Sequence, residues 1–216
     1  MSTERECGYE CLGIIDADNV TLPYDLQKFE DDLKKIKRFE GKLPDNVLEH
    51  TARAVAIARY LASDNSELQR MIWVHDIPEI VVGDVIITKK AATIPDKDEP
   101  EMRAAAELLN SEDLKLFARF RNAERFLYDG EVECVDATAI LACIIEKVEG
   151  NVFYHHHVSQ TRQELFGISA VEYTQEQKEK FEEKLKKALP DCEEKAAAML
   201  LLELQMHYVN RLWGEI

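Results

Sequence analysis

The sequence predicts an all-α protein, and two observations carry that prediction. Apolar residues recur three or four positions apart along almost the whole chain, which is the spacing of one helix face. Glycine and proline, the residues that most often interrupt helices, number only 8 and 6. Strand signals are weak, and the best of them is the β-branched run at residues 81–87. We find no internal repeat and no low-complexity tract.

The length of 216 residues suffices for one substantial core and is marginal for two. We therefore expect a single domain over residues 1–216, with a core at about 24–153 and a helical extension at 154–216 packed on it. The expected helices lie at residues 24–38, 46–63, 66–82, 98–109, 111–126, 135–153, 174–188 and 191–213.

Capping signals support several of these helices. Asp45 or Asn46 can cap the helix at 46–63. The helix at 174–188 opens as a capping box, with Thr174 at the N-cap and Gln177 three residues later. Pro190-Asp191 then ends this helix and caps the next.

One polar connection containing a proline, residues 88–101, is long enough to form a functional lid.

The composition excludes several classes of protein. A net charge of −15 repels a phosphate polyanion, so we expect no long nucleic acid as a partner. No segment approaches the roughly 18 consecutive apolar residues of a membrane span. The charged N-terminus contains no secretory signal, so we expect a cytoplasmic location. Five scattered cysteines suit reduced thiols, and no second ligand pair lies near Cys7 and Cys11 to complete a zinc site: Cys7, Cys11, Cys134, Cys143 and Cys192.

The segment WVHDIPEIVVGDV, residues 73–85, places four ionisable side chains in an apolar stretch. His75 and Asp76 are ligand types for transition metals. Glu79 lies between them on a helix face, where it could orient a water or donate a proton. A divalent ion would also explain how Asp76 is tolerated in apolar surroundings. The alternative is a helix-end pair, with the histidine hydrogen-bonded and the aspartate at the solvent rim.

Further ligands must come from other helices. His50, in the first turn of the helix at 46–63, is the best partner for His75 among the six histidines. Glu146 lies beside Ala142 and Cys143 on an apolar helix, where small neighbours leave room for an ion. Glu146 could equally be a solvated residue of a charged EKVE face. The tract His155-His156-His157 favours a surface or oligomer-interface role, because consecutive histidines point to different helix faces.

The order His50, His75-Asp76 and a later carboxylate resembles that of the HD-domain metal-dependent phosphohydrolases. The segments VLEHTARAVAIA, VHDIPEIVVGDV and AILACIIEKVE are similar to those of the 5′-deoxyribonucleotidase branch, over roughly residues 24–150. The pattern HDxxExxxGD, with an upstream EH and a downstream EKxE, is fairly specific. The resemblance implies an HD-domain helical bundle and a homodimer.

The resemblance also implies roles for individual residues. His50, His75 and Asp76 would bind the metal, and Glu79 would contact the attacking water or the leaving phosphate. Asp84 would bind the sugar near its 3′-hydroxyl.

Arg38 would hold the substrate phosphate, a task that suits guanidinium geometry. A lysine of the 88–90 region could help to neutralise the same phosphate.

The chain departs from the family pattern at two positions. The fourth metal ligand is an aspartate in the family, and Glu146 occupies that position here. Asp136 is a possible substitute, although it lies on a different helix face. The family places a Gly-Trp after its arginine, whereas Phe39 follows Arg38 in this chain.

The sequence therefore predicts a phosphohydrolase that uses one divalent transition metal ion (manganese, cobalt, zinc, iron or nickel). The expected substrate is a small nucleotide, a (deoxy)ribonucleoside 5′-monophosphate. Two alternatives are a (deoxy)nucleoside triphosphate hydrolase and a catalytically degenerate HD domain that binds a nucleotide or a partner. Late in the chain, the apolar stripe at residues 199–206 favours a core or dimer contact over a cofactor site.

Overall fold

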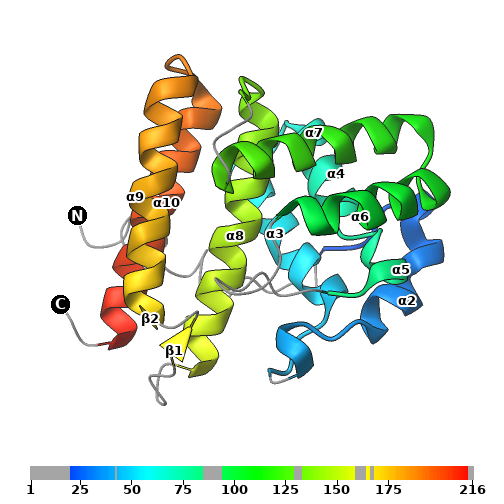
Figure 1. The fold of residues 1–216 in the computed structure, drawn as a ribbon, viewed down its shortest axis with the longest axis horizontal. Coiled ribbons are helices and arrows are strands. Elements are labelled where there is room, and N and C mark those ends of the chain that lie inside the picture. Colours follow the sequence, from blue (N-terminus) through cyan, green and yellow to red (C-terminus); the bar gives the residue numbers. More distant parts are fainter. Residues whose placement is uncertain are drawn as a thin grey trace.

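The structure is a computed structural model that describes residues 20–41, 43–84, 94–128, 133–158, 164–165 and 168–213. These residues confirm the all-α prediction (Figure 1). The helices are η2 (Tyr24–Phe29), α2 (Glu30–Lys35), η3 (Phe39–Gly41), α3 (Val47–Leu61), α4 (Ser66–Val74), α5 (Glu79–Val82), α6 (Ile94–Leu108), α7 (Ser111–Tyr128), α8 (Ala137–Val158), α9 (Ala170–Ala188) and α10 (Glu193–Trp213). Two short strands, β1 (Glu164–Leu165) and β2 (Ile168–Ser169), pair antiparallel.

Helix α8 is the central element of the bundle. Each residue from Ala139 to Ile145 is at most 1 % exposed, so this part of the helix is apolar and buried on all its faces. It contacts α3, α4 and α7 as well as α10, and Figure 1 shows it between the α9–α10 pair and the remaining helices. One hydrophobic cluster includes buried residues from Leu22 to Tyr208. The late helices therefore pack on the same core as the early ones.

The chain at residues 36–38 leaves the helix that we expected at 24–38. A 3₁₀-helix precedes α2, which ends at Lys35, and Ile36 is extended. The backbone instead pairs with the start of α3, through Val47 N–H to Ile36 O at 3.1 Å and Arg38 N–H to Asp45 O at 3.3 Å. The prediction was wrong here because this pairing replaces the helical hydrogen bonds.

The N-terminus of α3 confirms the predicted cap. The side chain of Asn46 accepts a hydrogen bond from Glu49 N–H at 3.1 Å, which satisfies one of the free amides of the first turn.

The expected continuous helix at 66–82 is interrupted, and this prediction was wrong. Helix α4 ends at Val74, a turn covers residues 75–78, and α5 begins at Glu79. The cause is Pro78, which has no N–H to donate and whose ring would clash with the Val74 carbonyl. Gly83, with a φ of 77°, ends α5, so the strand signal at 81–82 was also wrong, whereas residues 85–87 lie outside the described residues.

Helix α6 begins at Ile94 rather than at 98, so the expected connection at 88–101 is helical from residue 94 onward. Residues 88–93, which include Lys89 and Lys90, lie outside the described residues. Helices α7 and α8 end at Tyr128 and Val158, later than the expected 126 and 153.

The predicted capping box at Thr174 is wrong, because α9 already begins at Ala170. Thr174 is buried, and its hydroxyl donates to Ala170 O at 2.9 Å, a back-bond within the helix. The break before Pro190 is confirmed, since α9 ends at Ala188. Asp191 lies two residues before the start of α10 and pairs with Lys195 at 3.1 Å, so the N-cap position belongs to Cys192.

Three of the five cysteines lie in the described residues. Cys134, Cys143 and Cys192 are free, as expected, whereas Cys7 and Cys11 lie outside the described residues.

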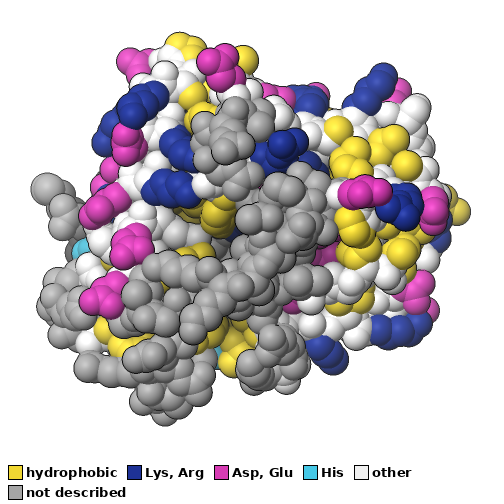
Figure 2. All heavy atoms as spheres, in the orientation of Figure 1, with side chains coloured by type: hydrophobic (Ala, Val, Ile, Leu, Met, Phe, Trp, Pro, Cys, Tyr) yellow, Lys and Arg dark blue, Asp and Glu magenta, His cyan; other side chains and the backbone are white. Residues whose placement is uncertain are grey.

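The apolar stripe expected at residues 199–206 lies on α10. Leu201, Leu202 and Met206 are buried, so much of this stripe is part of the core. No helix among the described residues is long and apolar enough to span a membrane. In the described part of the face in Figure 2, acidic and basic side chains lie next to one another.

The expected surface role is wrong for His155, which is only 1 % exposed, whereas His156 and His157 are exposed. Nε2–H of His155 donates to the Thr174 hydroxyl at 2.9 Å, and Nδ1 accepts from Trp213 Nε1–H at 2.9 Å. Acceptance at Nδ1 needs the neutral ring, because a protonated ring carries a hydrogen on both nitrogens. Burial lowers the pKa of His155 to about 4.

We expect this histidine to make the protein less stable in mild acid. Its pKa is lowered on folding, so its contribution is complete above the unfolded value of about 6.5 and is lost as the pH falls toward 4. Between about pH 7.5 and pH 4.5 it accounts for about 2–3 kcal/mol of the free energy of unfolding.

The variant His155→Gln can keep both hydrogen bonds without titrating. Urea unfolding at several pH values should show a flatter pH dependence for this variant than for the wild type. The same pH dependence of the unfolding free energy in both proteins would show that His155 is not its source.

Candidate metal centre

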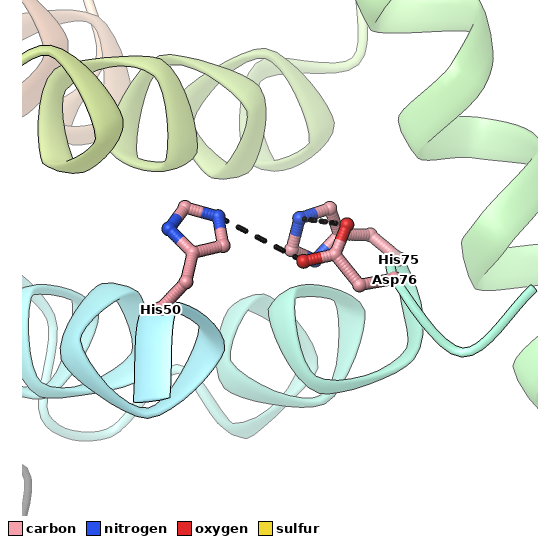
Figure 3. A group of neighbouring side chains, drawn as sticks. All are labelled: His50, His75 and Asp76. Carbon is pink, nitrogen blue, oxygen red and sulfur yellow. Dashed lines mark ion pairs between the residues drawn. The ribbon is translucent and has the colours of Figure 1, made fainter. Parts of the chain in front are cut away.

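Three side chains from two adjoining elements meet inside the bundle (Figure 3). His50 comes from the first turn of α3, and His75 and Asp76 come from the turn that directly follows α4. Their ligand atoms all lie within 4.8 Å of one another, and each residue is less than 10 % exposed. The structure thus brings together three of the four predicted metal ligands as one group that could hold an ion.

The two imidazole rings are oriented by hydrogen bonds on their far sides. Nδ1–H of His75 donates to Ile72 O at 2.6 Å, and Nδ1–H of His50 donates to Oε2 of Glu149. This arrangement directs Nε2 of each ring into the group, where a metal ion that displaces any proton could bind it. Both Nε2 atoms are buried and make no hydrogen bond. A buried nitrogen that makes no hydrogen bond is unfavourable, and an ion bound between the rings would remove that penalty.

The separations between these atoms match those of ligands around one ion. Nε2 of His75 lies 2.9 Å from Asp76 Oδ1, and Nε2 of His50 lies 3.7 Å from Asp76 Oδ2. Two ligands bound at about 2.1 Å in tetrahedral or octahedral geometry lie about 3.0–3.5 Å apart, or somewhat more with angular distortion. The donor set of two imidazoles and a carboxylate suits zinc, manganese, cobalt, iron or nickel.

Glu146 approaches the group from α8 but is also held by a lysine. Its Oε1 lies 3.5 Å from Nε2 of His50, which is again a ligand-to-ligand distance. Its Oε2 pairs with Nζ of Lys147 at 2.7 Å, and the same lysine pairs with Glu124 at 2.9 Å. Glu146 is buried, so the reading of it as a solvated residue is wrong. It stands next to the three-residue group, in reach of His50.

The charges at the site are predominantly negative. Burial and the Arg38 charge lower the pKa of His50, but Glu149 and Glu146 outweigh them and raise it to about 9. Burial by itself would raise the pKa of Asp76, whereas the His75 and His50 rings hold it at about 2. A buried site that draws a proton onto a histidine and keeps its carboxylates ionised also favours a divalent cation.

The other predicted site residues are not part of this three-residue group and have different settings. Arg38 is mostly buried, and its Nη1 is 3.3 Å from Asp45 and 3.6 Å from Glu149. Glu79 is the first residue of α5, and Asp84 follows Gly83; both are partly exposed.

Asp136 is excluded from the site. It caps α8 by accepting from Ala139 N–H at 3.0 Å, and it pairs with Arg119.

The comparisons with known proteins agree with this geometry. The family model described as an HD domain matches residues 30–189. The chain belongs to the HD domain family. Neither the curated proteins nor the solved structures contain a match to it. HD domains are in general metal-dependent phosphohydrolases, and in this one His50, His75 and Asp76 could hold the ion.

Sequence reasoning missed the buried charges that surround the centre, above all Glu149, Lys147 and Glu124. Glu149 is 5 % exposed and Glu124 is 3 % exposed. A signal was present in the sequence: the helix that carries Glu146 and Glu149 is apolar on every face at residues 139–145. A helix of that kind is buried, and the few charges along it are buried with it.

Proposed function

We propose that this HD domain is a metal-dependent phosphohydrolase that cleaves the phosphate from a small nucleotide, a (deoxy)ribonucleoside 5′-monophosphate. The observation that carries the proposal is the pair of buried, unbonded Nε2 atoms facing the Asp76 carboxylate. This arrangement can bind a metal ion. Without an ion, two buried nitrogens make no hydrogen bond, which is unfavourable. The choice of a nucleotide rests on the resemblance of the HDxxExxxGD segment to the 5′-deoxyribonucleotidase branch.

His50, His75, Asp76 and Glu146 would hold the ion. When bound, it supplies a Lewis acid that polarises a phosphoryl oxygen and lowers the pKa of a water molecule toward neutrality. Such an ion also reverses the local potential, which allows a phosphate to approach a chain of net charge −15.

The remaining residues would bind and orient the substrate. Glu79, three residues after Asp76, would accept the proton of the attacking water. Arg38 has donors besides the Nη1 that faces Asp45 and Glu149, and these would hold the phosphate. Asp84, just after Gly83, would accept a hydrogen bond from the 3′-hydroxyl of the sugar.

We expect purified protein to release inorganic phosphate from nucleoside 5′-monophosphates when manganese, cobalt or zinc is added. The measurement is phosphate release from a panel of ribo- and deoxyribonucleotides, with chelator-treated protein as the control. Release of pyrophosphate or triphosphate from nucleoside triphosphates would instead support the triphosphate hydrolase alternative. Metal or nucleotide binding without any turnover would support a catalytically degenerate domain, and either result would contradict the proposal.

A further inference from the structure

A buried carboxylate that belongs to no predicted ligand set lies behind the candidate metal centre. Glu149 is on α8, three residues after Glu146 and on the same side of the helix. It is 5 % exposed, and its two carboxylate oxygens face the His50 ring and the Arg53 guanidinium.

One oxygen of this carboxylate fixes a metal-facing ring. Oε2 accepts the hydrogen bond from Nδ1–H of His50, whose Nε2 faces Asp76 and Glu146 from the opposite edge of the ring. A carboxylate at Nδ1 selects the tautomer in which Nε2 carries a lone pair, prevents the ring from rotating and makes Nε2 more basic.

The other oxygen anchors Glu149 to the rest of the fold. Oε1 accepts from Nε–H of Arg53 at 2.5 Å, and Nη2 of Arg53 reaches both oxygens of Asp45 at 2.9 and 3.0 Å. The Arg53 guanidinium also lies over the Phe153 ring, 4.2 Å from its centroid. The Arg53 guanidinium thus fixes Glu149, and contacts with Asp45 and Phe153 fix the guanidinium.

We propose that Glu149 is a positioning residue for the metal centre, which sets the tautomer and direction of His50 through the Arg53–Glu149–His50 chain. The inference rests on the proposed metal-dependent function. Glu149 binds neither the ion nor the substrate in this proposal. Because it also lies 3.6 Å from Nη1 of Arg38, the proposed phosphate-binding residue, the test reads metal affinity rather than turnover. Partners of this kind typically change metal affinity by about 10–100-fold.

The test is the affinity of full-length protein for Zn²⁺, measured by competition with a chromophoric chelator. In Glu149→Gln the side-chain volume is kept and the charge is lost, and we expect Zn²⁺ to bind about 10–100-fold more weakly. In Glu149→Asp the charge is kept for Arg53, but the shorter side chain no longer reaches His50. We expect weaker binding in this variant too, with the thermal midpoint closer to that of the wild type. The second variant keeps the test decisive if the glutamine variant does not fold.

The matched control is Asp113→Asn, which removes the charge of another buried, arginine-paired carboxylate whose partners, Arg70 and Asn110, are not candidate metal ligands. Asp113 is 3 % exposed and pairs with Arg70 at 2.6 Å. This control should lower the thermal midpoint and leave Zn²⁺ affinity within about twofold of the wild type.

A spectroscopic readout separates positioning from a structural role. In the Zn²⁺-loaded wild type, the Nδ1–H proton of His50 should give a downfield resonance protected from exchange with water. In Glu149→Gln this resonance should move upfield and exchange faster. Unchanged affinity and an unchanged resonance in a folded Glu149 variant would overturn the inference while leaving the proposed function intact. A wild type that binds no metal would instead refute the proposed function.

Discussion

Replacing His75 by alanine is expected to remove metal-dependent phosphate release, lowering kcat/KM by more than about 100-fold. Loss of a residue that only hydrogen-bonds to a metal ligand already lowers metal affinity or activity by about 10–100-fold. Because His75 would be a direct ligand, we expect a larger loss. Its Nε2 is one of the two buried, unbonded nitrogens in the group. Asp76→Asn should have an effect of similar size, since Asp76 lies between both rings.

The measurement is phosphate release together with metal content per chain after gel filtration. His207→Ala is the matched control, because His207 is an exposed histidine on α10 outside the group. It should retain both activity and bound metal. Wild-type activity in folded His75→Ala would refute the proposed mechanism, whatever metal the protein contains.

Arg121→Met is expected to cause the largest loss of stability among the charged residues discussed. Arg121 is 7 % exposed and pairs with Glu124 on its own helix and with Glu101 on α6 at 3.2 Å. Its removal leaves two buried carboxylates without this cation, and breaking a buried pair in that way costs about 3–5 kcal/mol. For a chain of this length we expect the thermal midpoint to fall by roughly 10 °C.

The matched control for this variant is Arg103→Met on α6. Arg103 pairs with Glu99, but both side chains are well over half exposed, so the midpoint should stay unchanged. Glu124 keeps Lys147 as a partner, so the rescuing change is Glu101→Gln added to Arg121→Met, which removes the charge of the α6 carboxylate and should recover part of the lost stability. Differential scanning calorimetry on the four proteins measures these differences. A folded Arg121→Met protein with the midpoint of the wild type would contradict the account.

Local pattern predicts the helices well where apolar spacing and burial agree. The cap at Asn46, the break before Pro190 and the buried face of α10 all follow from residue types within a few positions. Predictions failed where a distant contact decided the structure. Residues 36–38 leave their helix because they pair with residues 45–47, a contact that periodicity does not reveal.

At the candidate site, too, local patterns were predicted correctly and features that depend on distant contacts were missed. The grouping of His50 with His75 and Asp76 was expected from ligand types, helix spacing and the family resemblance. Glu149 was missed because the EKVE segment is typical of a solvated helix face, whereas Glu149 is buried where α3 packs against α8. His155 was placed at the surface for a related reason: its partners Thr174 and Trp213 lie 19 and 58 residues further along the chain.

The central claim is that this HD domain holds one divalent ion between α3, α4 and α8. The most direct test is a crystal structure of the Mn²⁺-loaded protein with anomalous diffraction data. We predict one strong peak about 2.0–2.3 Å from Nε2 of His50, Nε2 of His75 and a carboxylate oxygen of Asp76, with Glu146 turned toward it. At saturating Mn²⁺, the absence of a peak among these residues, or a peak elsewhere in the bundle, would contradict the account.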